Sequence, residues 1–199
     1  MRNGPSSIDA DRVEAVREAC PTAWLGVDAN QGFTRGSLER LLAVLVQSRV
    51  ELIEQPFPIG QEALLEGFRS PIPIAADESL QSVADVPALA GRFKVLNIKL
   101  DKCGGLTGAL AIVTAAREHG LGTMVGNMLG TSLAMAPAFI VGQLCSVTDL
   151  DGPVFLNADR DQRIEYRDGF VDCPEGVWGA SPTCGSLLEH GRAGGAPVG

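Results

Sequence analysis

Short runs of apolar and β-branched residues alternate with amphipathic stretches along the first 150 residues or so, and no hairpin turn joins one run to the next. Strands that alternate with helices pair in parallel, because each helix returns the chain to the same end of the sheet. Six segments are expected to be strands: 23–28, 50–54, 72–77, 95–99, 121–126 and 147–151. The alternation therefore predicts an α/β fold with a parallel sheet.

The stretches between these segments have helical spacing. Leu38, Leu41, Leu42 and Leu45 follow Ser37, which is expected to cap the N-terminus of their helix. Residues 106–119 form a second amphipathic pattern, with Gly120 as its stop. Residues 8–20 are also helical in pattern, so we expect the chain to begin with a helix rather than a strand.

The repeat ends near Pro153. Residues 163–172 contain an Asp168-Gly169 turn between two short apolar patterns, which predicts a small β-hairpin. From Ser181 onward small and polar residues dominate, as in disordered tails. We therefore expect a βα-repeat domain over residues 1–152, a hairpin and extension over 153–180, and a disordered tail over 181–199.

Composition excludes several classes of function. The 199 residues carry a formal net charge of −8, which would repel nucleic acid. No apolar run approaches the roughly 18 residues of a membrane span, and residues 1–11 do not resemble a signal peptide. Five cysteines without a CxxC pair indicate neither a disulfide framework nor a zinc site. We expect a cytoplasmic protein without nucleic-acid or membrane partners.

Charged residues occupy the carboxyl ends of the expected strands: Asp28, Glu54, Asp77, Lys99, and then Asp149 and Asp151. The first four are 26, 23 and 22 residues apart, which fits one βα unit per step. In a parallel barrel the carboxyl ends of the strands meet at one rim, where active sites form. The alternation of polar and apolar residues along strand 95–99 turns Lys99 inward, and Asp149 and Asp151 share one side.

Three carboxylates that meet in a partly dry site repel one another unless they take up protons or bind a cation. Asp28, Glu54 and Asp77 have no His or Cys beside them in sequence. Oxygen ligands of this kind suit Mg²⁺. Taken singly, either aspartate is more often a turn or capping residue, and the alternative for Lys99 is a lysine that extends to solvent. The interpretation as a metal site therefore depends on these residues lying at corresponding positions at the ends of successive strands.

Four motifs, in this order, resemble the enolase superfamily, specifically its mandelate racemase and muconate lactonizing enzyme-like C-terminal barrel: Val27-Asp28-Ala29-Asn30, Ile53-Glu54-Gln55-Pro56, Ala76-Asp77-Glu78-Ser79, and the segment 98–105 that contains Lys99. Two further motifs, Met128-Leu129-Gly130-Thr131-Ser132 and Asp149-Leu150-Asp151-Gly152-Pro153, resemble dipeptide epimerases of the L-Ala-D/L-Glu type. The resemblance covers roughly residues 8–180.

The resemblance implies a partial (β/α)8 TIM-type barrel of about six of its eight βα units, and a magnesium-dependent racemase or epimerase that abstracts the α-proton of a dipeptide through an enediolate. It implies these roles: Asp28, Glu54 and Asp77 as Mg²⁺ ligands, Lys99 as an acid/base catalyst, Asp149 and Asp151 as ligands of the substrate ammonium, Asn127 and Met128 in substrate binding, and Asn30 and Lys102 in support. A turn role for Asn30 stays open, and Lys102 is expected to lean toward the outer face.

The family's second acid/base lysine lies in a Lys-x-Lys motif. This sequence does not contain that motif, because the lysines of this sequence are Lys94, Lys99 and Lys102. The capping domain and the first two strands are also expected to be absent, and a homo-oligomer or a complementing N-terminal fragment could cover the two open edges. The alternatives are a non-catalytic remnant, or a related enzyme such as an N-acylamino acid racemase, a muconate cycloisomerase or an o-succinylbenzoate synthase. Gly130 stands where family members often have Glu, which leaves the substrate side chain open.

Overall fold

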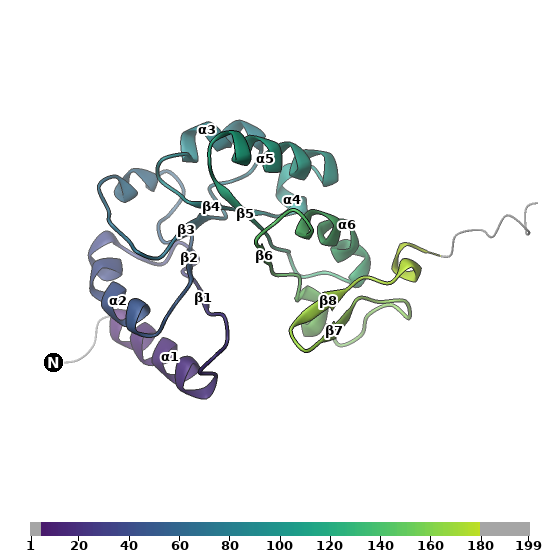
Figure 1. Cartoon of the computed structure of the whole chain (residues 1–199), viewed down its shortest axis with the longest axis horizontal. Helices are drawn as coiled ribbons and strands as arrows, with labels where there is room; N and C mark the ends of the chain where they lie inside the picture. The colour runs from purple at the N-terminus through teal and green to yellow at the C-terminus, as the bar shows by residue number, and fades with distance from the viewer. Residues whose placement is uncertain (1–4, 180–199) are drawn as a thin grey trace, which may run out of the picture.

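The computed structural model describes residues 5–179. Its main sheet has six parallel strands in chain order: β1 (Gly26–Asp28), β2 (Leu52–Glu54), β3 (Ile74–Ala76), β4 (Val95–Ile98), β5 (Gly122–Val125) and β6 (Val147–Thr148). The sheet curves into a half-barrel with the helices on its outer side (Figure 1). The predicted parallel α/β architecture with six βα units is confirmed.

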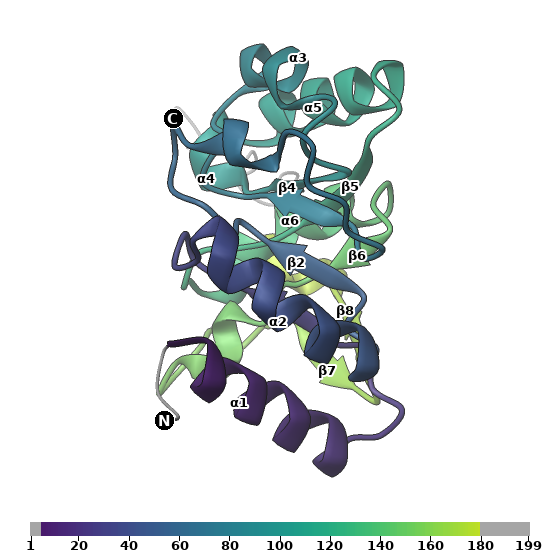
Figure 2. The ribbon, with the colours of Figure 1, turned by 90° about the vertical axis from the view of Figure 1, so that its left-hand side faces the viewer.

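The helices occupy the segments between the strands. The α-helices are α1 (Pro5–Ala19), α2 (Arg35–Gln47), α3 (Val86–Leu89), α4 (Leu100–Cys103), α5 (Leu106–Glu118) and α6 (Ser132–Gly142). The short 3-10 helices are η1 (Glu62–Leu65), η2 (Val83–Asp85), η3 (Gly152–Phe155) and η4 (Glu175–Trp178). Helices α1 and α2 pack side by side at the β1 end of the sheet (Figure 2). The prediction that a helix precedes the first strand is confirmed.

Side chains from the two faces of the sheet enter different apolar clusters, as strand alternation requires. Ile53 is fully buried in the main core, which fills the layer between the sheet and helices such as α2 and α5. Its neighbour Leu52 belongs instead to a small cluster with Ala75 and Met124. The stabilising core therefore lies mainly outside the half-barrel, and the inner face remains available for other groups.

Helix α2 begins one turn earlier than the sequence predicted. Thr34 is its N-cap, and the prediction of Ser37 in that role is wrong. The two residues form a capping box, in which the Thr34 hydroxyl accepts from the Ser37 backbone at 3.2 Å and the Ser37 hydroxyl accepts from the Thr34 backbone at 2.9 Å. Ser37 thus stabilises the same helix end from inside its first turn.

The last predicted strand, 147–151, is too long. Strand β6 ends at Thr148, and Asp151 is instead the N-cap of η3, which starts with Gly152 and Pro153. The hairpin that follows is confirmed: β7 (Glu165–Arg167) and β8 (Phe170–Asp172) pair antiparallel around a turn in which Asp168 and Gly169 both have positive φ. The expected tail over 181–199 lies outside the described residues, and the domain boundaries stay predictions.

Both outer strands of the half-barrel have one free edge within residues 5–179, since β1 pairs only with β2 and β6 only with β5. A cavity of about 600 Å³ opens between them and is lined by residues of both strands, including Asp28, and also by Glu54 of β2 and by Asp149, which follows β6. The closure of the barrel is therefore incomplete on the side where the carboxylates lie.

The helices of the described part, residues 5–179, include none with the length and apolar character needed to cross a membrane. The expectation of a cytoplasmic location stays a prediction.

Candidate active site

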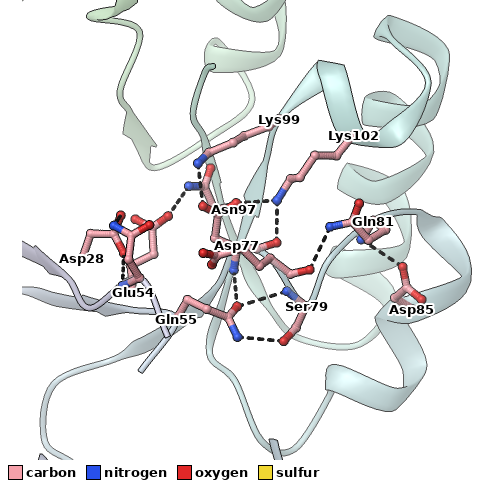
Figure 3. A network of polar contacts seen from close by, with 12 residues as sticks. Asp28, Glu54, Gln55, Asp77, Ser79, Gln81, Asp85, Asn97, Lys99 and Lys102 are labelled. Atoms are coloured by element: carbon pink, nitrogen blue, oxygen red, sulfur yellow. Dashed lines mark hydrogen bonds and ion pairs between the residues drawn. The ribbon is translucent and has the colours of Figure 1, made fainter. Parts of the chain in front are cut away.

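The three carboxylates predicted as metal ligands stand on one rim of the half-barrel. Asp28 and Glu54 are the last residues of β1 and β2 and are paired in register, and Asp77 directly follows β3 (Figure 3). Neighbouring parallel strands are about 4.8 Å apart, so this register brings the carboxylates into each other's electrostatic range. The structure thus places them at adjacent positions at the carboxyl ends of the strands.

Asp77 is held by two lysines from the junction of β4 and α4. The Lys99 ammonium lies 2.5 Å from Oδ2 of Asp77, and the Lys102 ammonium contacts Oδ1 and the backbone carbonyl of the same residue (Figure 3). Burial of Asp77, whose residue exposure is 4%, would raise its pKa, but the hydrogen bonds and charges of Lys102 and Lys99 outweigh burial and lower the pKa.

The same contacts correct one prediction. Lys102 does not lean toward the outer face, because α4 begins at Leu100, immediately after the strand, and its first turn carries Lys102 back over the rim to Asp77. The predicted orientation of Lys99 toward the interior agrees with its contact to the same carboxylate.

Glu54 is a buried carboxylate with an amide partner. Its residue exposure is 9%, and Asn97 Nδ2 donates a hydrogen bond to Oε1 at 2.5 Å. Burial, reinforced by the charges of Asp28 and Asp77, raises the pKa of Glu54 to about 7, although Asn97 and Lys99 oppose the shift. A carboxylate in this state gains from any added cation.

Asn97 is a site residue that the sequence analysis did not single out. It belongs to β4 and lies two residues before Lys99, so strand alternation places both side chains on one face. Asn97 is 1% exposed, and its Oδ1 has no hydrogen-bond partner among residues 5–179. The polar alternation along β4 was the signal that could have identified it.

Asp28 is more exposed and is bound by Asn30. The backbone and side-chain nitrogens of Asn30 donate to the two carboxylate oxygens at 2.8 and 2.6 Å. Burial and the charges of Asp77 and Glu78 raise the pKa of Asp28, whereas the Asn30 amide and Lys99 lower it. Asn30 also has a positive φ of 43°, so it combines a turn conformation with the supporting contact.

Gln55 fixes the turn that carries Asp77 and was also missed by the sequence analysis. Its side chain is 1% exposed, and its Oε1 accepts from the backbone amides of Asp77 and Ser79 at 2.9 and 3.1 Å. Its Nε2 donates to the Phe57 carbonyl and to the Ser79 hydroxyl at 2.9 and 2.8 Å (Figure 3). One buried amide therefore joins the turns after β2 and β3.

The loops after β5 and β6 hold the residues predicted to bind substrate. Asp149 and Asp151 are exposed on either side of Leu150, which is 1% exposed. Partial burial and the charge of Asp151 raise the pKa of Asp149. Asp149 lines the same cavity as Asp28 and Glu54, so this loop lies near the carboxylates. Met128 is 52% exposed.

The side-chain amide of Asn127 is hydrogen-bonded to the backbone of a neighbouring loop. Its Nδ2 donates to the Asp149 carbonyl at 2.9 Å, and its Oδ1 accepts from the Gly152 amide at 2.9 Å. Both ends of the side chain are therefore used by the backbone of the loop after β6.

The donor set suits a hard divalent cation in the type of its ligands and in their placement on adjacent strands. Asp28, Glu54 and Asp77 offer carboxylate oxygens from adjacent strands, and the buried Oδ1 of Asn97 lies beside them with no partner among the described residues. Within residues 5–179 no three His, Cys, Asp or Glu side chains are gathered closely enough to form a finished metal site. Asp77 is engaged by the two lysines instead.

Comparison with known families identifies the fold. The family model described as Enolase C-terminal domain-like matches residues 1–179. The chain belongs to this family. The resemblance inferred from the strand-end motifs is therefore confirmed at the level of the enolase family and its C-terminal barrel.

Relatives within the enolase family include racemases and epimerases. The chain is 42% identical over 171 residues to an N-acetyl-D-glutamate racemase of Pseudoalteromonas sp, covering 85% of this chain and 54% of the relative. It is also 42% identical over 160 residues to the L-Ala-D/L-Glu epimerase of Escherichia coli (strain K12), covering 80% of this chain and 50% of the relative. The chain thus spans about half the length of the curated relatives it matches.

Solved structures agree with this placement. An enolase family member from Agrobacterium tumefaciens with homology to dipeptide epimerases, with bound sodium and L-Ala-L-Glu, superposes with a TM-score of 0.79 at 44% identity, covering 82% of this chain and 50% of that one. A dipeptide epimerase from Methylococcus capsulatus complexed with Mg and L-Arg-D-Lys superposes with a TM-score of 0.78 at 34% identity, covering 87% of this chain and 52% of that one.

Proposed function

We propose that this chain carries the metal-binding and proton-transfer groups of a magnesium-dependent racemase or epimerase that acts on a dipeptide. The observation that carries the proposal is the position of Lys99, whose ammonium lies 2.5 Å from Asp77 Oδ2 and whose charge also acts on Asp28 and Glu54. An amine beside three carboxylates on one rim has the composition of a site for proton abstraction next to a carboxylate. The relatives described above support the assignment.

Each group has a role that follows from its chemistry. Mg²⁺ held by Asp28, Glu54 and Asp77 would stabilise the negative charge that develops on the substrate carboxylate when the α-proton leaves. Lys99 would exchange the proton with the α-carbon from one face. The exposed pair Asp149 and Asp151 would hold the ammonium group of a dipeptide, because two close carboxylates favour a cation between them.

Inversion of the α-carbon requires a second acid/base group on the opposite face of the substrate. Lys102 is bound to Asp77, and Lys94 is exposed and precedes β4, at the opposite end of the strand from the rim. This chain by itself is therefore expected to exchange the α-proton without inverting the centre.

Deuterium exchange tests the proposal directly. The chain is incubated with L-Ala-L-Glu and MgCl₂ in D₂O, and the loss of the glutamyl α-proton signal is followed by proton NMR. Wild-type protein should wash out the signal, and Lys99→Met should abolish the exchange. Lys94→Met, the matched control at the other end of the same strand, should leave the rate unchanged. If the wild-type chain neither exchanges the proton nor binds Mg²⁺, the proposal fails in favour of a non-catalytic remnant.

A second candidate is a racemase of N-acylated amino acids. The observation that favours it is the 42% identity to the N-acetyl-D-glutamate racemase. An acylated nitrogen carries no charge, so such a substrate would leave Asp149 and Asp151 without a partner. Faster exchange with N-acetyl-L-glutamate than with L-Ala-L-Glu in the same assay would select this candidate over the dipeptide.

The partners of the chain are also a matter of proposal. Unpaired strand edges attract further strands, and β1 and β6 each have one within the described residues. We infer that in an active assembly further polypeptide, from a second copy or from a complementing N-terminal fragment, covers these edges. Sedimentation at increasing concentration, with and without the N-terminal half of a close relative, should show association, and a monomer under both conditions would contradict it.

A further inference from the structure

The loop after β6 is held by two side chains from outside it. Asn127, after β5, contacts the loop backbone at Asp149 and Gly152, both at 2.9 Å. Tyr166, in β7, donates its hydroxyl hydrogen to the Leu150 carbonyl at 2.5 Å. Three backbone groups within four residues are thus fixed from two separate elements, and these four residues include both members of the acidic pair.

Gly152 makes the Asn127 contact possible. A Cβ atom at position 152 would lie 2.2 Å from Asn127 Oδ1 and 3.1 Å from the Met128 carbonyl, which is closer than atoms approach without a shift. Glycine therefore allows the loop to lie directly against the asparagine amide.

Asn127 and Tyr166, which together form a clamp on the loop, hold two like charges close together. Leu150 anchors the loop in the core, and the carboxylates of Asp149 and Asp151 on either side remain exposed. Burial, together with the charges of Asp151, Asp159 and Asp149, raises the pKa of Tyr166 to about 12, so its hydroxyl keeps its proton and donates across the neutral range. Adjacent carboxylates repel unless a cation lies between them, and a rigid loop prevents them from separating.

Building on the proposed function, we propose that Asn127 and Tyr166 are positioning residues that hold Asp149 and Asp151 as one ammonium site and thereby select substrates with a free amine over N-acylated ones. Neither side chain needs to touch the substrate. Their effect is transmitted through the backbone of residues 149–152.

Binding of two ligands that differ in one charge tests the inference. Titration calorimetry in MgCl₂ compares L-Ala-L-Glu with N-acetyl-L-glutamate for wild type, Tyr166→Phe and Asn127→Ala. Each variant should raise the Kd of L-Ala-L-Glu by about threefold to tenfold, as expected for one hydrogen bond lost in Tyr166→Phe and two in Asn127→Ala, and change that of N-acetyl-L-glutamate by less than about twofold. Equal weakening of both ligands would overturn the inference, because a general loss of structure does not distinguish them.

Gln143→Ala is the matched control, since it removes an exposed amide that donates to a carbonyl within α6 and not to the loop. It should change neither Kd. Tyr166→Phe removes a single hydroxyl, so the test stands on this variant if Asn127→Ala fails to fold.

A second measurement needs no ligand and separates this inference from the proposed function. Carbon NMR follows the titration of the Asp149 carboxyl. Partial burial and the charge of Asp151 raise its pKa, and its other charged neighbours include Lys99 and Asp28. In the double variant Asn127→Ala/Tyr166→Phe the pKa should fall toward its ordinary value as the two carboxylates move apart. An unchanged titration would refute the clamp. If wild type binds neither ligand, the proposed function fails and this titration still decides whether the clamp exists.

Discussion

At the scale of single residues, Glu54 shows how closely placed carboxylates affect one another's protonation. Its carboxylate is buried beside two others, and the hydrogen bond from Asn97 offsets only part of the cost, so its pKa stays near 7. A folded-state pKa above the ordinary value of 4.5 means that the folded chain binds this proton more tightly than the unfolded chain. The contribution of Glu54 to stability is therefore present at low pH and is lost as the pH rises through 7.

Replacing Glu54 by Gln should remove this pH dependence. In the presence of a chelator, the free energy of unfolding of Glu54→Gln relative to wild type should increase by on the order of 2 kcal/mol between pH 4.5 and pH 8. Urea denaturation at both pH values measures the difference. The exposed Glu51→Gln, three residues earlier, is the control. A difference that does not change with pH would show that Glu54 is not strained by its surroundings.

At the scale of elements, the turns after β2 and β3 behave as one unit. Gln55 satisfies two backbone amides, one carbonyl and one hydroxyl from these turns, and its own side chain is almost fully shielded from water. Buried backbone groups that lose their partner carry the full cost of desolvation. The position of Asp77 therefore depends on a residue of the preceding strand–turn segment.

Gln55→Ala should lower the free energy of unfolding by about 3 kcal/mol, because it leaves several buried polar groups unpaired at once. Urea denaturation provides the measurement. Gln81→Ala removes an exposed amide that donates to Glu78 and should cost less than about 0.5 kcal/mol. Similar losses for the two variants would contradict the special role assigned to Gln55.

The elements also mark the limit of what the sequence could predict. Apolar periodicity located the six strands in order, and their polar last residues indicated a shared rim. The contacts of Lys102 and Gln55 were not predictable, because they depend on the conformation of short turns between elements, which has no periodic signal. The alternation of polar and apolar residues in β4 indicated Asn97, but its role in the site comes from its hydrogen bond to Glu54, 43 positions away in the sequence.

At the scale of the whole molecule, stability should fall toward the two ends of the sheet. Strands β3 and β4 have neighbours on both sides, whereas β1 and β6 each have one within residues 5–179. Backbone hydrogen bonds at an unprotected edge open more readily than those at the centre.

Hydrogen exchange should therefore follow the strand order. Amides of Gly26–Asp28 and Val147–Thr148 should exchange fastest among the strand amides, and those of Ile74–Ala76 and Val95–Ile98 slowest. Mass spectrometry of deuterated peptides can measure the gradient at low protein concentration. Equal protection of the outer and central strands would show that the edges are already covered by another chain.

The two cations that reach Asp77 come from a single junction, one from the end of β4 and one from the first turn of α4. Each residue of an α-helix advances by about 100°, so one inserted or deleted residue between positions 99 and 102 would swing the second ammonium away from the carboxylate. Insertions and deletions among homologues of this sequence should accordingly occur in other connections and not in the β4–α4 junction.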